Sequence, residues 1–277
     1  MTRRTLFRWA RMGAAALPLT GSSQAQAPPA QAADELPEAQ RKKKLKVVFV
    51  GAHVDDWVDC AGTLARYTRL GHEALCISFT PGDSQSMADQ RHMPVEKLAA
   101  LRREHAGKGT KILGARMLYL NQHNQRMRVD PDTYAEFNKT LLDIEPDVVF
   151  TMWPIEFHPD HRAAANLAYN AGLQSGMQFA LFFCETAGGR EMQPQQFVPN
   201  RRVDVTLVAD QKRDSYLANE FIGQGWPEAD LWAKFRGMEY GCQYAEAFVQ
   251  VSTVAAMRSE NLYPHRWYYG GLRLADN

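Results

Sequence analysis

The feature that most constrains the fold is a short apolar run that ends in a cluster of polar side chains. Residues 47–50 are Val, Val, Phe and Val. The run is too short for a helix and rich in β-branched residues, which predicts a strand buried on both faces, as in a parallel sheet. After two small residues, His53, Asp55 and Asp56 come where this strand should end. Because ligands bind at the carboxyl ends of the strands in open α/β sheets, these side chains are expected to line a binding crevice.

Strands and helices alternate through most of the chain. Further buried strands are expected at residues 74–79, 116–120, 147–153 and 179–183, with helices at 58–70, 94–113, 131–144 and 159–173. The second of these helices should be interrupted by Gly107 and Gly109. The alternation predicts βαβ units with right-handed crossovers, and therefore an α/β fold: a single domain with a Rossmann-like parallel sheet flanked by helices. The pattern then loosens into an edge or antiparallel strand, two helices and a late strand, at residues 203–208, 209–222, 228–240 and 247–251.

The amino-terminal residues are expected to lie outside this domain. Arg3 and Arg4 begin a twin-arginine pattern, and a short apolar stretch and small residues follow it. This predicts a twin-arginine-type signal peptide at residues 1–27, and therefore export to the periplasm or the extracellular space. Residues 28–44 are rich in Ala, Pro and Gln and then in charge, which is typical of a linker. Residues 45–277 remain for the α/β domain.

Composition argues against several classes of protein. Removing the signal peptide would take away four arginines and no acids, which turns the formal net charge of +1 into a small negative one. No basic surplus indicates a nucleic-acid partner, and no apolar stretch is long enough to cross a membrane. The widely spaced cysteines form no C-x-x-C motif and are interpreted as structural: Cys60, Cys76, Cys184 and Cys242. The sequence gives no indication of an oligomeric state.

A second polar cluster follows the strand expected at residues 147–153. It reads His158-Pro159-Asp160-His161 and has the same placement as the first: a strand end, a short loop and a helix start with proline at its opening. Both clusters should therefore face one crevice. Two histidines and a carboxylate that leave positions open for water and substrate are typical of a catalytic zinc site or of a ferrous facial triad.

With these two motifs, the sequence resembles the LmbE-like, or PIG-L, family of zinc-dependent deacetylases. The family hallmarks are Ala-His-Pro-Asp-Asp-Glu after the first strand and a later His-Pro-Asp-His, against residues 52–57 and 158–161 here. The resemblance extends from Lys46 to Val251. It implies that His53, Asp56 and His161 bind zinc, or another divalent metal, and that Asp55 is the general base.

The resemblance assigns further roles and also has departures. It implies that His158 stabilises the oxyanion or donates a proton to the leaving amine, and that Arg102 reaches the substrate. Asp160 is expected to fix His158 or a helix end. Three positions depart from the family pattern, which predicts a changed substrate or a lower rate: Val54 in place of proline, Trp57 in place of glutamate, and Asn124 nearest to an expected acid.

The function expected from the sequence is hydrolysis of an N-acyl group, most simply an acetamide on an amino sugar or a sugar conjugate, by a zinc-activated water. A non-haem iron oxygenase is an alternative, although such triads are familiar on all-β barrels. Another is an exported, non-catalytic carbohydrate-binding protein that retains a structural zinc, with tryptophans as sugar platforms: Trp57, Trp153, Trp226 and Trp232. A nicotinamide dehydrogenase is disfavoured because residues 51–53 are not a glycine fingerprint.

Overall fold

The computed structural model describes residues 44–186 and 197–251. The predicted signal peptide, the linker up to residue 43, and residues 187–196 and 252–277 lie outside the described residues. Within the described part of the chain, no helix has the length and apolar character needed to cross a membrane.

The described residues form a seven-stranded sheet in the order β3-β2-β1-β4-β5-β7-β6. Five strands are parallel: β1 (Lys46–Gly51), β2 (Glu73–Ser78), β3 (Arg116–Tyr119), β4 (Val148–Thr151) and β5 (Ala180–Cys184). The last two pairings, of β7 (Ala245–Gln250) with β5 and with β6 (Arg201–Asp204), are antiparallel. Residues 47–50 of β1 are all buried, which confirms the prediction of a strand covered on both faces.

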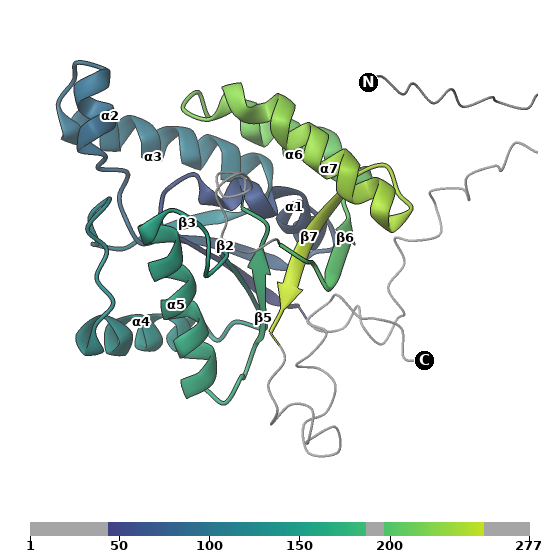
Figure 1. The fold of residues 1–277 in the computed structure, drawn as a ribbon, viewed down its shortest axis with the longest axis horizontal. Coiled ribbons are helices and arrows are strands. Elements are labelled where there is room, and N and C mark those ends of the chain that lie inside the picture. Colours follow the sequence, from purple (N-terminus) through teal and green to yellow (C-terminus); the bar gives the residue numbers. More distant parts are fainter. Residues whose placement is uncertain (1–43, 187–196, 252–277) are drawn as a thin grey trace, which may run out of the picture. The chain divides into compact units, whose positions relative to one another are not determined.

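Helices cover both faces of the sheet (Figure 1). One face carries α1 (Ala61–Arg69), α3 (Val95–Ile112), α6 (Ala209–Leu217) and α7 (Trp226–Tyr240), and the other carries α4 (Pro131–Ile144) and α5 (Pro159–Gln174). Short elements complete the described part: η1 (Asp56–Cys60), α2 (Gln85–Gln90), η3 (Thr206–Val208) and η4 (Gly223–Gly225). This is the predicted α/β class, a mostly parallel sheet between two helical layers.

The topology places one crevice at the carboxyl ends of β1 and β4. These strands are neighbours, with Val50 opposite Thr151. The chain leaves β1 for η1 and α1 on one face and leaves β4 for α5 on the other (Figure 1). Such a reversal of strand order is where open α/β sheets bind their ligands. Both histidine clusters of the sequence lie at this point.

Several elements differ from the predicted ones, and the helix expected at residues 209–222 already ends at Leu217. The expected interruption at Gly107 and Gly109 is wrong, because α3 is continuous through both glycines. The strand expected at 203–208 is β6 at 201–204, and η3 follows it from Thr206. The short helix α2 was not expected at all; it begins after Ser84, whose side chain accepts a hydrogen bond from the backbone N–H of Met87.

The glycine at position 109 of the continuous helix α3 has a packing reason. Trp57 is 1% exposed, and its Nε1 donates to the carbonyl oxygen of Val54 at 2.9 Å. The far edge of its indole lies against Gly109, where a Cβ would overlap the ring and would also come within 2.8 Å of the carbonyl oxygen of Ser215. Gly109 is therefore required for close packing of η1 under α3. Gly107 has no such neighbour, because a Cβ there would meet nothing within 4 Å.

These two glycines give a matched pair of substitutions. Gly109→Ala should lower the free energy of unfolding by about 1–3 kcal/mol because the indole of Trp57 must shift. Gly107→Ala should raise it by up to about 1 kcal/mol, since alanine is the better helix former and the site is open. Urea denaturation followed by tryptophan fluorescence measures both. Equal effects of the two substitutions would contradict the packing described for Trp57.

Candidate metal centre

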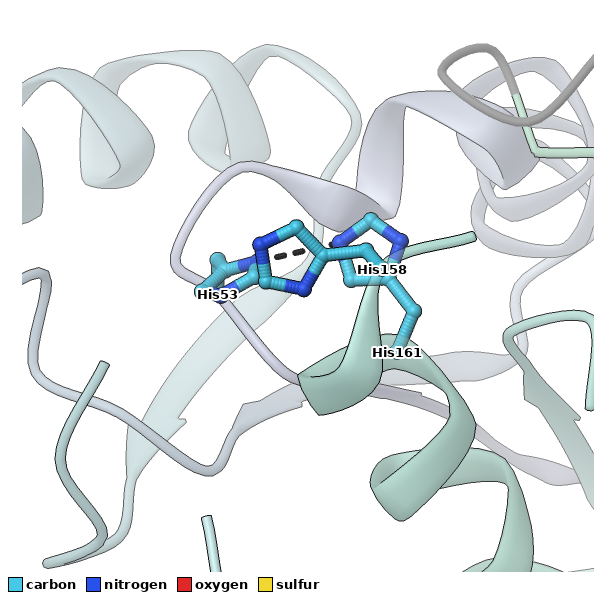
Figure 2. A group of neighbouring side chains, drawn as sticks. All are labelled: His53, His158 and His161. Carbon is cyan, nitrogen blue, oxygen red and sulfur yellow. Dashed lines mark hydrogen bonds between the residues drawn. The ribbon is translucent and has the colours of Figure 1, made fainter. Parts of the chain in front are cut away.

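Two chain segments supply the polar groups of the crevice. His53 and Asp56 follow β1, and Asp56 begins η1. His158 is the N-cap of α5, Pro159 is at its start, and His161 lies in its first turn. Proline at the first helical position sets the backbone angle there and leaves one fewer N–H group unpaired. Figure 2 shows the three imidazoles facing one another across the gap between the segments.

Three of these groups form a compact triangle. His53 Nδ1 lies 3.0 Å from His161 Nε2, and Asp56 Oδ1 lies 3.4 Å from the first nitrogen and 3.3 Å from the second. Two ligands held tetrahedrally on zinc, at bonds of about 2.0–2.1 Å, are about 3.3 Å apart. The spacing of the three atoms therefore fits one zinc-sized cation. The structure brings together the three residues predicted as ligands.

Two carboxylates fix the orientation of these imidazoles. His161 Nδ1 lies 2.8 Å from Glu156 Oε2, and His53 Nε2 lies 3.2 Å from Asp160 Oδ2. When each outward nitrogen donates its proton to a carboxylate, each inward nitrogen is left with a lone pair. Two inward lone pairs can bind one cation, and a proton on one of the nitrogens can serve the same pair as a hydrogen bond. The donor set therefore fits a metal ion that takes nitrogen and oxygen ligands, of which zinc is the common example.

The electrostatics of the buried cluster also favour a cation. Burial alone would lower the pKa of His53, but the charge of Asp56 and the hydrogen bond to Asp160 outweigh it and raise that pKa to about 9. In the same way, Asp56 and Glu156 outweigh burial and raise the pKa of His161 well above its usual value. The two imidazoles in turn outweigh burial at Asp56 and lower the pKa of its carboxyl. The carboxylates thus stabilise positive charge at the centre of the triangle.

His158 differs from the other two histidines. One nitrogen from each of His53, His158 and His161 lies within 4.8 Å of the others, so His158 is also a candidate ligand by distance. Its Nδ1, however, accepts a hydrogen bond from the backbone N–H of Asp160 at 3.2 Å. Burial and the two neighbouring imidazoles lower the pKa of His158, which favours its neutral form. A neutral imidazole that accepts at Nδ1 carries its proton at Nε2, which makes it a hydrogen-bond donor and not a ligand.

The adjacent aspartates have different partners. Asp56 Oδ2 accepts the backbone N–H of His53 at 2.8 Å, while Oδ1 faces the histidines. Both oxygens of Asp55 lie on Arg102 Nη2, at 3.0 and 3.1 Å. The predicted base, which precedes Asp56 in the chain, is thus joined to the arginine predicted to reach the substrate. Gly51 allows the turn to be this tight, because a Cβ there would lie 2.8 Å from the Cβ of Asp56.

Two supporting residues were not predicted from the sequence. Glu156 is 1% exposed, and besides His161 it binds the backbone N–H of His158 through Oε1 at 2.7 Å. The sequence feature that could have identified Glu156 is its position between a strand end and a histidine motif, because imidazole ligands commonly donate their second N–H to a carboxylate. Gln125 has a φ of 61° and donates its backbone N–H to Asp160 Oδ2 at 2.5 Å. The carboxylate of Asp160 therefore supports His53, and its contact with His158, where it was expected to act, is made by its backbone N–H.

The departures from the family pattern can also be placed. Trp57 is buried under α3, so it presents no face for stacking on a sugar. Val54 is fully buried and packs near Gly82, where a Cβ would lie 3.4 Å from it. The backbone N–H of Asn124 donates to Asp83 Oδ1 at 3.1 Å, which ties the loop after β3 to the loop after β2.

Part of the chain matches a known family model. Residues 48–172 match the family model of PIG-L, described as GlcNAc-PI de-N-acetylase. The 4-oxalmesaconate hydratase of Pseudomonas putida KT2440 is 28% identical over 129 residues, which are 45% of this chain and 50% of the hydratase. The chain thus matches about half the length of that curated relative.

Solved structures share the fold. The 4-carboxy-2-hydroxymuconate hydratase GalB from Pseudomonas putida KT2440 has a TM-score of 0.66 and 22% identity over 76% of this chain and 97% of its own. The N,N'-diacetylchitobiose deacetylase from Pyrococcus horikoshii has a TM-score of 0.62 and 22% identity over 77% of this chain and 86% of its own. The comparisons thus show a match to the PIG-L, or LmbE-like, family domain at residues 48–172, on a fold shared with deacetylases and hydratases.

Proposed function

We propose that this protein is a zinc-dependent hydrolase that removes an N-acyl group, most simply acetyl, from an amino sugar or a sugar conjugate. The observation that carries the proposal is the triangle of His53, Asp56 and His161, with the preceding residue Asp55 paired to Arg102. Three protein ligands leave room on zinc for water and substrate. The PIG-L family match and the fold shared with a chitobiose deacetylase support the same chemistry.

The bound zinc would supply Lewis acidity for the amide carbonyl and a lower pKa for a water molecule. Asp55 would take the proton of the attacking water, since it neighbours the ligand Asp56 in the chain and its own carboxylate is paired with Arg102. His158 would donate its Nε2–H to the oxyanion or to the leaving nitrogen. The proton is at Nε2 because Nδ1 accepts the backbone N–H of Asp160. Glu156 and Asp160 would keep the imidazoles in one orientation through the reaction.

A second candidate is a hydratase that adds water to a carbon–carbon double bond. The observation that favours it is the 28% identity with 4-oxalmesaconate hydratase. The same residues would serve, because a positioned base and a histidine donor can activate water for addition as well as for hydrolysis. The two reactions have different products: acetate and an amine in one, and loss of a conjugated double bond in the other. A screen for acetate release and for loss of ultraviolet absorbance distinguishes them.

We also infer that the protein is exported. The support is the twin-arginine pattern at Arg3 and Arg4 with the apolar and small residues after it. Export would place the enzyme among extracellular or periplasmic sugars, which suits a small-molecule N-acetylated substrate.

The role of Asp55 is tested by Asp55→Asn. The amide keeps the shape of the side chain but cannot take a proton, so kcat for acetate release should fall by about 10²–10⁴-fold. Zinc content should stay at the wild-type level because Asp55 is not a ligand. Turnover and zinc per chain are measured on the same preparation, with N,N'-diacetylchitobiose and N-acetylglucosamine as first substrates. Undiminished turnover at full zinc content would remove Asp55 from this role.

The carboxylate of Glu156 gives a test that needs no substrate. Both of its oxygens accept hydrogen bonds, from His161 and from the backbone N–H of His158, and an amide can accept only one of them. Glu156→Gln should therefore weaken zinc binding about 10–100-fold. Competition with a chromophoric chelator measures the affinity. Glu136→Gln, at an exposed carboxylate on α4, is the matched control and should leave it unchanged.

A further inference from the structure

The tandem aspartates Asp55 and Asp56 are adjacent in sequence but have separate partners. Asp56 is held toward the ligand triangle, because its Oδ2 accepts the backbone N–H of His53 and its Oδ1 faces both imidazoles. Asp55 is held away from those contacts by Arg102, whose Nη2 lies 3.0 and 3.1 Å from its two oxygens. One aspartate is thus assigned to the histidines and the other to an arginine.

Arg102 is anchored in a way that suits a fixed support. It is 4% exposed and lies on α3, and its Nη1 contacts the carbonyl oxygen of Gly82 at 3.4 Å. Gly82 has a φ of 90°, and a Cβ there would lie 3.2 Å from the Cβ of Arg102. The arginine is therefore enclosed between α3 and the loops after β1 and β2. A guanidinium so enclosed, with both oxygens of Asp55 on one nitrogen, has little surface left for a substrate.

The ion pair between Arg102 and Asp55 matters because two adjacent aspartates beside a metal ion could both bind it. Carboxylate oxygens are good zinc ligands, and the Asp55 side chain is only 14% exposed, so water solvates it poorly. Without a partner it would gain most by turning to the nearest cation, the one bound by its neighbour Asp56. A base that becomes a ligand has lost its free lone pairs and has filled a position that water needs.

We propose that Arg102 is a positioning residue that keeps Asp55 out of the metal coordination sphere, and so decides which of the two aspartates is ligand and which is base. The role of Asp55 as a base rests on the proposed function, because only a hydrolase or hydratase uses it in that way. The exclusion of Asp55 from the coordination sphere concerns metal binding alone. It can be tested with the metal as the only probe.

The experiment replaces zinc with Co²⁺ and records the visible absorption spectrum, which reports the number and kind of ligands. The variants are Arg102→Gln, Asp55→Asn and the double variant. Arg103→Gln is the matched control, since Arg103 is the next residue of α3 and its Nη1 contacts the carbonyl oxygen of Pro81 at 3.1 Å. Circular dichroism and thermal denaturation verify the fold of each. If Arg102→Gln does not fold, Arg102→Lys is used, which keeps the charge but loses the planar fork.

The expected result is that Arg102→Gln changes the Co²⁺ spectrum, toward weaker absorption and higher coordination, because Asp55 now binds the metal. The double variant should restore the wild-type spectrum, because a neutral asparagine at position 55 is a poor metal ligand. Arg103→Gln should have the wild-type spectrum. Arg102→Lys should give a smaller change of the same sign. A wild-type spectrum in Arg102→Gln, or in folded Arg102→Lys when it replaces that variant, would overturn the proposal, as would a changed spectrum that persists in the double variant.

Kinetics separate a positioning role from contact with substrate. On N,N'-diacetylchitobiose, Arg102→Gln should lower kcat by about 10²-fold, as for a misplaced catalytic group, and change KM less than about twofold. A raised KM at wild-type kcat would instead make Arg102 a substrate ligand and overturn the proposal. If wild-type protein releases no acetate from any amide, the deacetylase proposal fails on its own, and the Co²⁺ spectra still decide the role of Arg102.

Discussion

The close approach of His53 Nδ1 and His161 Nε2, 3.0 Å apart, is the constraint on which the described site depends. His53 Nδ1 and His161 Nε2 are brought to this distance by segments more than a hundred residues apart in sequence, and each ring is held from behind by a buried carboxylate. At this distance the two nitrogens can share a proton or hold one metal cation between them. Asp56 adds a third donor at matching distances, and the burial of the cluster makes its charges interact strongly. The cost of assembling these groups is offset when the cation binds.

The fold explains how distant segments meet so closely. β1 and β4 are neighbours at the point where the strand order reverses, so the loops after them diverge to opposite faces and leave a crevice between them. Small residues then set the fine geometry. Gly51 lets Asp56 turn back over the strand, and Gly109 lets α3 approach η1 over the indole of Trp57. Packing at α3 also fixes Arg102 against Asp55, which links the helical layer to the chemistry of the site.

Much of the fold could be predicted from the sequence because its signals are local. The apolar run at residues 47–50 and the turn residues between periodic segments identify the parallel strands and most helices. The predicted interruption of α3 at Gly109 was wrong because the reason for that glycine is a tertiary contact with Trp57, which no local pattern contains. Likewise α2 is six residues long, too short to show an apolar stripe.

The residues of the site also divide into those that local motifs identify and those that only tertiary contacts identify. The motifs at residues 53–56 and 158–161 identify the candidate ligands because they combine metal-binding residue types with a strand end. Glu156 and Gln125 could not be identified with the same assurance: one is a single acid in a loop, and the other acts through its backbone N–H in a left-handed conformation. The link between Arg102 and Asp55 joins residues 47 apart and follows only from the three-dimensional structure.

The replacement of the family glutamate by Trp57 leaves the ligand triangle and Asp55 in place, so the departure alters packing under α3 and not the donor set.

The central claim is that two imidazoles and a carboxylate, and not three imidazoles, hold the metal. X-ray absorption at the zinc edge of the purified protein tests it most directly. The proposed function predicts one zinc per chain with two imidazole nitrogens and further oxygen ligands at about 2.0–2.2 Å. Three imidazoles, any sulfur ligand, or no stoichiometric zinc would contradict it.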